Sequence, residues 1–264
     1  MKAGNSLLYF TDSDKNIFII FNPKTGGITE INTGWNPEAL AVSRDYKIAV
    51  TANRDSDNNV KSDTISIIDI EKKKELGQVI AGDRPISVAI SPDSRFALAG
   101  LKDGEIVSIN LEEKRVDGRL SAGKNPAAIS YSEDGKVAYA LSRDEEKLYI
   151  IDTEHMKISA EISLGNGAYA FAVKDRRTLL VANSEDDTIS VIDLMLMKII
   201  EDNTVGYAPK DIVLSMTDAY VADTGSNEIS IISLSDMREY DVIDTGAEPF
   251  KLALDGEKLY VLFD

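Results

Sequence analysis

The sequence has no cysteine and a single histidine, His155. Without cysteine the chain cannot form disulfides, thiolate nucleophiles, iron–sulfur clusters or cysteine-bound zinc sites. One histidine is also too few for a metal site built from several imidazoles of one chain. We therefore predict a protein without a cofactor.

Positive charge is scarce: 29 Lys and Arg residues face 45 Asp and Glu residues, which leaves a net charge of −16. A surface of this sign repels a phosphate backbone, so we expect no nucleic-acid partner. No apolar run approaches the ~18 residues that a membrane span needs, so we expect no membrane insertion. The first residues are polar and lack an apolar signal region, which predicts a cytoplasmic protein, or a periplasmic or extracellular one had a leader been removed.

What the sequence does contain is a repeat. Six glycines each close a short apolar alternation, spaced by about 41 residues except for a first interval about seven residues longer. They are Gly34, Gly82, Gly123, Gly165, Gly206 and Gly246. Proline follows three residues later in five of the six cases. This spacing indicates structural units of equal size.

Each unit contains four short strands. In the unit that begins at Gly123, apolar stretches with period-two alternation lie within residues 125–132, 137–141, 147–152 and 158–163. We name these strands A to D in chain order. A period near 40 residues with four strands is typical of a β-propeller blade, because one four-stranded sheet cannot bury both of its faces alone.

The glycines delimit five complete units, and the residues left at the two ends make about one more. We therefore predict an all-β, six-bladed β-propeller of four-stranded antiparallel blades, forming one domain over residues 1–264. In this prediction both termini close the last blade: residues 250–264 supply strands A and B, and residues 16–21 and 28–33 supply strands C and D. Residues 7–10 then duplicate strand B. The alternative is an incomplete or open seven-bladed ring.

Several segments resemble the YVTN repeat. They are residues 50–53 (VTAN), 91–95 (SPDSR), 180–184 (LVANS), 188–193 (TISVID) and 220–224 (YVADT). The chain is therefore similar to the YVTN-repeat β-propeller family, which includes surface-layer modules and periplasmic propellers. The resemblance runs over nearly the whole chain and implies the propeller fold.

In a propeller, the D–A and B–C loops share one face, and the A–B and C–D loops share the other. Aromatic rings beside charged side chains follow the closing glycines, a composition typical of binding surfaces. The predicted site for a protein or small polar ligand consists of Trp35, Asn36, Glu38, Arg84, Asn125, Tyr169, Tyr207, Lys210 and Phe250. The alternative is that these residues form ordinary solvated loops.

One position of strand A carries an unusual pair of charges. It is small in four repeats (Ala39, Ser87, Ala128 and Ala170) but holds Asp211 and Lys251 in the other two. Because these repeats are consecutive and strands A converge near the propeller axis, we predict an ion pair in the channel. The pair either stabilises the closing blade or forms part of a channel site.

The loop that starts at Arg54 is about seven residues longer than its counterparts. In it, Asp55, Asp57 and Asn59 place oxygen atoms at alternating positions, as at the start of a calcium-binding loop. No glycine stands at the sixth position, and Ser66 stands where such a loop needs glutamate. We therefore favour a polar loop without a metal.

No combination of residues points to a catalytic site. His155 falls in a C–D turn, away from the predicted face, and has no serine or carboxylate at triad spacing. We predict a non-catalytic binding or scaffold module. One alternative is a metal-dependent hydrolase of the lactonase type, with ligands drawn from Glu38, Asn125 and Asn166 together with Asp83 or Glu248. The other is a structural module of a surface or multi-protein assembly.

Overall fold

The computed structural model describes residues 1–54 and 63–263, and the regular elements in this part of the chain are β-strands. They form six four-stranded antiparallel sheets and one two-stranded sheet. No helix of the described part is long and apolar enough to cross a membrane.

The strands follow one another in chain order. Blade 1 contains β1 (Lys2–Gly4), β2 (Leu7–Asp12), β3 (Ile17–Asn22) and β4 (Gly27–Asn32); blade 2 contains β5 (Pro37–Val42), β6 (Ile48–Asn53), β7 (Thr64–Asp69) and β8 (Lys74–Ile80); blade 3 contains β9 (Pro85–Ile90), β10 (Phe96–Leu101), β11 (Glu105–Asn110) and β12 (Arg115–Ser121). Blade 4 contains β13 (Pro126–Tyr131), β14 (Val137–Ser142), β15 (Lys147–Asp152) and β16 (Lys157–Ser163); blade 5 contains β17 (Ala168–Val173), β18 (Thr178–Asn183), β19 (Thr188–Asp193) and β20 (Lys198–Thr204); blade 6 contains β21 (Pro209–Leu214), β22 (Asp218–Asp223), β23 (Glu228–Ser233) and β24 (Glu239–Asp244). The C-terminal hairpin contains β25 (Pro249–Asp255) and β26 (Lys258–Phe263).

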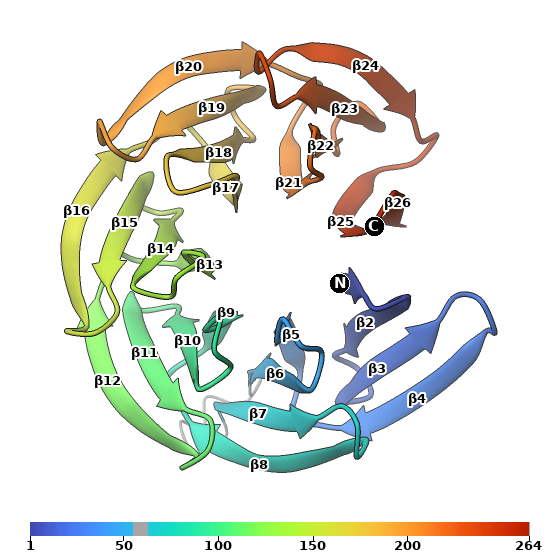
Figure 1. Cartoon of the computed structure of the whole chain (residues 1–264), viewed down its shortest axis with the longest axis vertical. Helices are drawn as coiled ribbons and strands as arrows, with labels where there is room; N and C mark the ends of the chain where they lie inside the picture. Colours follow the sequence, from blue (N-terminus) through green and yellow to red (C-terminus); the bar gives the residue numbers. More distant parts are fainter. Residues whose placement is uncertain (55–62, 264) are drawn as a thin grey trace. The chain divides into compact units, whose positions relative to one another are not determined.

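This architecture confirms the prediction of an all-β, six-bladed β-propeller with four-stranded antiparallel blades (Figure 1). In each blade, neighbouring strands pair in sequence order, so that strands B and C lie between A and D. The register is regular in the centre of a blade, where Val50 of β6 pairs with Ile67 of β7. Such β-branched cross-strand pairs stabilise a sheet whose two faces are both covered.

The prediction that both termini share one blade is wrong. Lys2 to Gly4 form strand β1, which pairs with β2 across a two-residue turn. The turn residues Asn5 and Ser6 have φ of 54° and 60°, and positive φ at both positions is the mark of a tight hairpin turn. Blade 1 is therefore complete from N-terminal residues alone. The tail forms its own two-stranded sheet, β25–β26.

Two compact units make up the chain, and each is described by itself. The first comprises Met1–Glu145 and Tyr149–Ser159, and the second comprises Glu146–Leu148 and Ala160–Asp264. The expectation of one domain over residues 1–264 stays a prediction.

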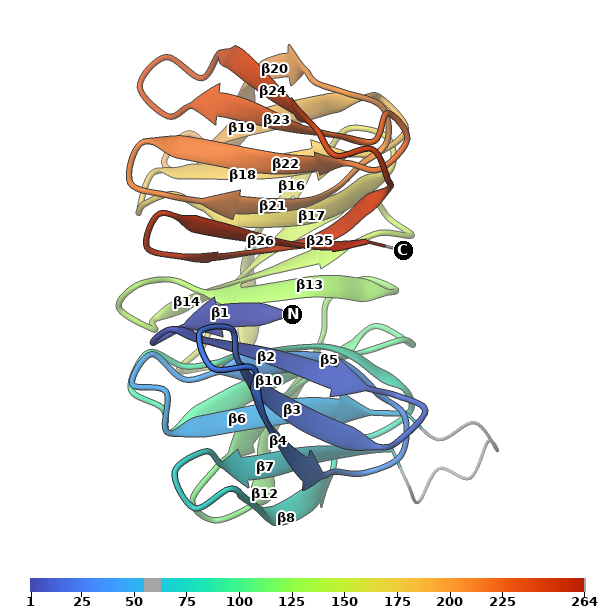
Figure 2. The same cartoon turned by 90° about the vertical axis from the view of Figure 1, so that its right-hand side faces the viewer.

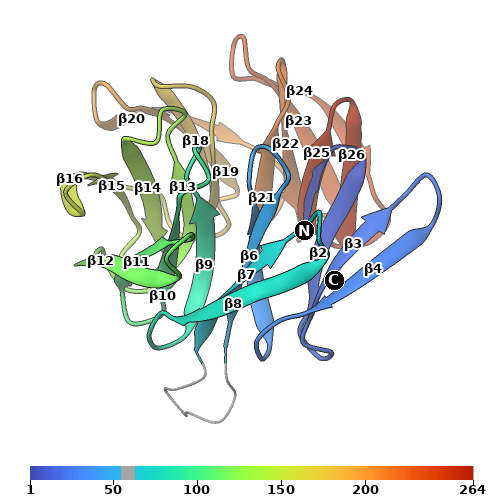
Figure 3. The ribbon, with the colours of Figure 1, turned by 60° about the horizontal axis from the view of Figure 1, so that its bottom comes forward.

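The cores of both units lie between successive sheets. In the first unit, one apolar cluster joins blades 1 and 2, another joins blades 2 and 3, and a third joins blades 3 and 4. Figure 3 shows the ribbons of these blades. In the second unit, one cluster joins blades 5 and 6, and a smaller one joins blade 6 and the C-terminal hairpin. Figure 2 shows the ribbons of blade 6 and the hairpin. Strand A contributes one large buried residue in blades 2, 3, 4 and 6 and in the C-terminal hairpin: Leu40, Val88, Ile129, Ile212 and Leu252. The corresponding Phe171 of blade 5 is only half-buried.

Candidate functional site

The D–A loops have a common backbone geometry. The second residue after the closing glycine has a positive φ in five blades: Asn36 (46°), Arg84 (53°), Asn125 (56°), Gly167 (68°) and Ala208 (50°). In four of these loops its N–H group donates to a side chain that directly precedes strand C. The pairs are Asn36 to Asn16 (2.7 Å), Arg84 to Asp63 (3.0 Å), Gly167 to Glu146 (3.3 Å) and Ala208 to Asp187 (2.8 Å). These side-chain acceptors satisfy the N–H groups of loop residues whose φ is positive, and so stabilise that backbone conformation.

Polar residues at the D–A/B–C end bond between a D–A loop and the neighbouring B–C loop. Glu38 forms an ion pair with Arg54 at 2.8 Å. Asn125 donates to Asp144 at 2.8 Å, and Asn166 donates to Asp186 at 2.9 Å. These contacts give Glu38, Asn125 and Asn166 a structural role, and they do not favour their use as metal ligands.

The aromatic residues of the predicted site differ in exposure. Trp35, in the first unit, is 66% exposed, and Tyr207, in the second, is 67% exposed. Tyr169 packs against the core between blades 5 and 6. The ring of Phe250 lies 6.0 Å from Lys210 Nζ and 5.5 Å from Lys251 Nζ. Only Trp35 and Tyr207 among these four therefore present most of their ring to solvent.

Asp211 and Lys251 lie close together in the second unit. Lys251 Nζ is 3.6 Å from Asp211 Oδ1, and the other oxygen of Asp211 accepts a 2.8 Å hydrogen bond from the N–H group of Leu252. The carboxylate therefore links β21 of blade 6 to β25 of the C-terminal hairpin. Because the two termini do not share a blade, the Asp211–Lys251 pair does not close such a blade.

The calcium candidates Asp55, Asp57 and Asn59 lie outside the described residues. Within residues 1–54 and 63–263, no group of three or more His, Asp or Glu side chains is placed to hold a metal ion.

A hollow of the first unit lies at the other end of the strands, where the A–B turns of blades 3 and 4 meet the C–D turn of blade 4. Its volume is about 660 Å³, within the usual range for small-molecule sites. It is lined by Ser91, Pro92, Asp93, Phe96, Leu98, Ser108, Asp117, Gly118, Arg119, Tyr131, Asp134, Gly135, Thr153, Glu154, His155 and Met156. We call it the blade 3–4 cavity.

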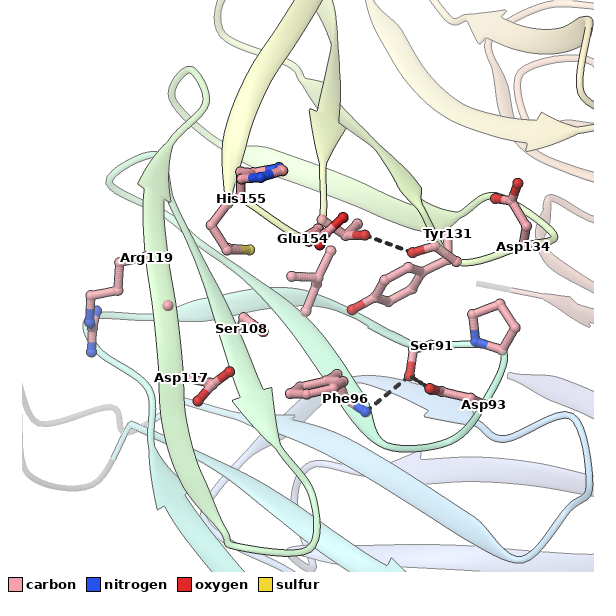
Figure 4. A pocket seen from close by; sticks show the side chains of 16 residues that line it. Ser91, Asp93, Phe96, Ser108, Asp117, Arg119, Tyr131, Asp134, Glu154 and His155 are labelled. Carbon is pink, nitrogen blue, oxygen red and sulfur yellow. Dashed lines mark hydrogen bonds between the residues drawn. The ribbon is translucent and has the colours of Figure 1, made fainter.

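The walls of the blade 3–4 cavity combine carboxylates with aromatic rings. Phe96 and Tyr131 project into the space from the two sheets, and Glu154 lies across it from Phe96 (Figure 4). Asp93, Asp117 and Asp134 complete the acidic wall. The arrangement provides negative charge beside apolar surface.

The two basic residues at the cavity are engaged elsewhere. Arg119 donates to Glu105 and to the carbonyl of Ala81, both at 2.7 Å. His155 Nδ1 lies 2.9 Å from Asp152 Oδ2, and this contact lowers the pKa of Asp152. The cavity thus keeps a surplus of negative charge, and His155 has a carboxylate partner that sequence spacing did not identify.

Protonation states in the cavity follow from burial and hydrogen bonding. Burial, helped by the Asp93 carboxylate, raises the pKa of Tyr131, so its hydroxyl stays neutral. Burial opposes ionisation of Asp93, but hydrogen bonds from Ser91 and from the N–H group of Arg95 outweigh it and lower the pKa. The cavity therefore offers the neutral phenol of Tyr131 and the ionised carboxylate of Asp93 at neutral pH.

Sequence reasoning missed this cavity because its residues look like repeated turns. Ser91 and Ser132 each donate to the aspartate two residues later, as Ser43 does in blade 2. The signal that distinguishes blades 3 and 4 is the pair Phe96 and Tyr131, which the other blades replace by Ile, Val, Thr, Leu or Asp at strand ends.

A second hollow, of about 590 Å³, lies in the second unit between the turns of blades 5 and 6. It is more open and has balanced charge, with Lys174 and Arg238 beside Asp218 and Asp236. Lys174 donates to the carbonyl of Leu234 at 2.7 Å. This hollow provides an internal comparison for the acidic cavity.

Comparison with known proteins places the fold in a family. No curated protein matches the sequence. The structure is similar to hydrazine synthase of Kuenenia stuttgartiensis, with a TM-score of 0.82 and 16% identity over 100% of this chain and 94% of that chain. At this identity the likeness shows the fold alone. The family model of the YNCE-like beta-propeller matches residues 7–256, whereas the narrower YVTN-repeat assignment stays a prediction. This match shows that the chain belongs to the YNCE-like β-propeller family.

Proposed function

We propose that the protein is a non-catalytic binding module that takes a small organic cation in the blade 3–4 cavity. The observation that supports this most is the coincidence of four acidic side chains with two aromatic rings in one hollow. A cationic head is attracted by carboxylates and by the faces of aromatic rings. An apolar body fits against Phe96, Leu98 and Met156.

The proposal keeps the prediction of a binding module but moves the site. The D–A/B–C face offers exposed aromatic rings, but its carboxylates and amides already bond to neighbouring loops. The blade 3–4 cavity combines its carboxylates with aromatic rings, although Asp117 pairs with Arg115 at 2.9 Å and Asp93 and Asp134 accept hydrogen bonds from serines. A polar ligand that carries positive charge fits the second environment better.

The test compares two ligands that differ only in charge. Phenethylamine and 2-phenylethanol have the same size, but only the amine is protonated at neutral pH. A charge-assisted contact contributes roughly 1.5–3 kcal/mol, so the amine should bind about ten to a hundred times more tightly. Isothermal titration calorimetry measures both affinities.

Variants locate the site. Glu154→Gln should weaken the amine about tenfold and leave the alcohol unchanged, because it removes one negative charge from the wall. Asp236→Asn, in the hollow between blades 5 and 6, is the matched control and should change neither affinity. Equal affinities for amine and alcohol, or equal losses in both variants, would contradict the proposal.

A further inference from the structure

The C-terminal hairpin ends in a strand that is apolar like an interior strand but exposed like an edge strand. In blades 2 to 5, five of the six residues of strand B are buried. The corresponding strand β26 has the sequence Lys-Leu-Tyr-Val-Leu-Phe, and none of its residues is buried. Leu262 and Phe263 are 40% and 45% exposed. An apolar strand of this kind normally lies inside a sheet.

The hairpin occupies the places of strands A and B beside blade 6. Thr224 donates to the carbonyl of Pro249 at 2.8 Å, and Asp211 accepts from the N–H group of Leu252. Leu259 and Val261 pack against the same small core as Leu252 and Ile229. Within the described residues, however, this sheet contains only β25 and β26. The places of strands C and D are therefore vacant in it.

The face of blade 6 that lies toward the hairpin is also incompletely covered. All six residues of its outer strand β24 are exposed, and Ile243, which pairs with Ile229 on the face toward the hairpin, is 42% exposed. The core between blade 6 and the hairpin contains three buried residues, whereas the core between blades 5 and 6 contains nine. Two further strands beside β26 would cover this surface.

The charge of the surface indicates what kind of strands fit. Strand β24 carries Glu239, Asp241 and Asp244 and no basic residue, and Asp241 lies on the face toward the hairpin, because it pairs with Ile231. The whole chain has a net charge of −16, so a second copy of the same chain is repelled. A segment with basic residues is attracted instead.

We propose that the free edge of β26 binds a β-hairpin of a partner polypeptide, with alternating apolar residues and a surplus of basic side chains. Its first strand pairs antiparallel with β26, as β19 pairs with β18 in blade 5, where Ser190 lies opposite Val181. Its second strand places basic side chains near Asp241, the β24 carboxylate on this face. Backbone hydrogen bonds along an exposed strand edge provide affinity, and the side chains provide selectivity.

The probe for this proposal is a hairpin copied from the chain itself. Residues 64–80 form strands C and D of blade 2 and carry three lysines and three carboxylates. A peptide of this sequence with Glu71→Lys and Glu75→Lys has a surplus of positive charge. Fluorescence anisotropy should show it binding at least about tenfold more tightly than the unmodified peptide. The same basic peptide with Ile67→Pro should not bind, since proline removes a ladder N–H group.

Protein variants and hydrogen exchange locate the binding edge. Replacing Leu262 and Phe263 by serine should weaken the basic peptide about tenfold, because apolar contact area is lost. Ile28→Ser, at a 63% exposed position of the outer strand β4, is the matched control and should have no effect. Those β26 backbone amides that do not bond to β25 should exchange fast in the free protein and slow down when the peptide binds.

Three results would overturn the proposal. Slow exchange, in the monomeric free protein, of the β26 amides that do not bond to β25 would mean that another segment of the chain occupies the edge. A dimer in sedimentation analysis with slow β26 exchange would assign the edge to a second copy. Protection of other strands by the peptide, with β26 unchanged, would place the peptide elsewhere.

Discussion

At the scale of single residues, Asp223 stands out as a buried carboxyl at the end of β22. The corresponding residues of blades 2 and 5 are Asn53 and Asn183, whose amide groups donate to hydroxyls of strand C. In blade 6 the direction is reversed, since Ser230 donates to Asp223 at 2.6 Å. Asp223 Oδ1 is buried without a hydrogen-bond partner.

This environment makes stability depend on pH. Burial raises the pKa of Asp223 from 3.8 to about 7, although hydrogen bonds from Ser230 act in the opposite direction. Between these values the folded state holds a proton that the unfolded state has lost. Stability therefore decreases as pH rises from about 4 to about 7 and then levels off.

The substitution Asp223→Asn should remove this dependence. The variant should be more stable than the parent at pH 8, by roughly 2–4 kcal/mol, and nearly equal to it at pH 4.5. Urea denaturation at several pH values measures the difference. Parallel curves for parent and variant over this range would show that Asp223 does not titrate near neutrality.

At the scale of strands and turns, the turn Asn5–Ser6 decides whether blade 1 is complete. Asn tolerates the positive φ of 54° at Asn5, whereas a β-branched side chain does not. Asn5→Val should therefore destabilise the protein by about 1–2 kcal/mol. Asn5→Gly, the control, keeps the turn and should leave stability nearly unchanged. Thermal or chemical unfolding of both variants measures the effect, and equal losses would contradict a tight turn here.

The strands of the repeat could be predicted from the sequence, but strand β1 and the blade 3–4 cavity could not. The four-stranded repeat was predictable because glycine spacing and apolar alternation recur in each unit. Strand β1 was not, because its three residues, Lys2 to Gly4, are too few to show alternation. The blade 3–4 cavity was not predictable either, because it depends on how Phe96 and Tyr131 meet between two sheets. The alternation of apolar and polar residues within one strand does not show which side chains of two neighbouring sheets come together.

At the scale of the whole molecule, the two ends of the strands carry different surfaces. In the first unit, the D–A/B–C end has the exposed Trp35, and in the second unit it has the exposed Tyr207, each among loops whose polar groups bond to one another. The A–B/C–D end has the acidic blade 3–4 cavity. These surfaces can bind different partners, because no residue of the cavity belongs to the D–A or B–C loops.

The last prediction separates the two ends. Trp35→Ala and Tyr207→Ala remove rings that contribute little to the core, so each should change the free energy of unfolding by less than about 0.5 kcal/mol. Both variants should also bind phenethylamine as the parent does, since the cavity lies at the other end of the strands. If the D–A/B–C face binds a protein partner, the same substitutions should reduce the binding free energy of that partner by ~2 kcal/mol or more. Loss of amine binding in Trp35→Ala, measured by calorimetry with stability unchanged, would place the amine at the D–A/B–C end instead.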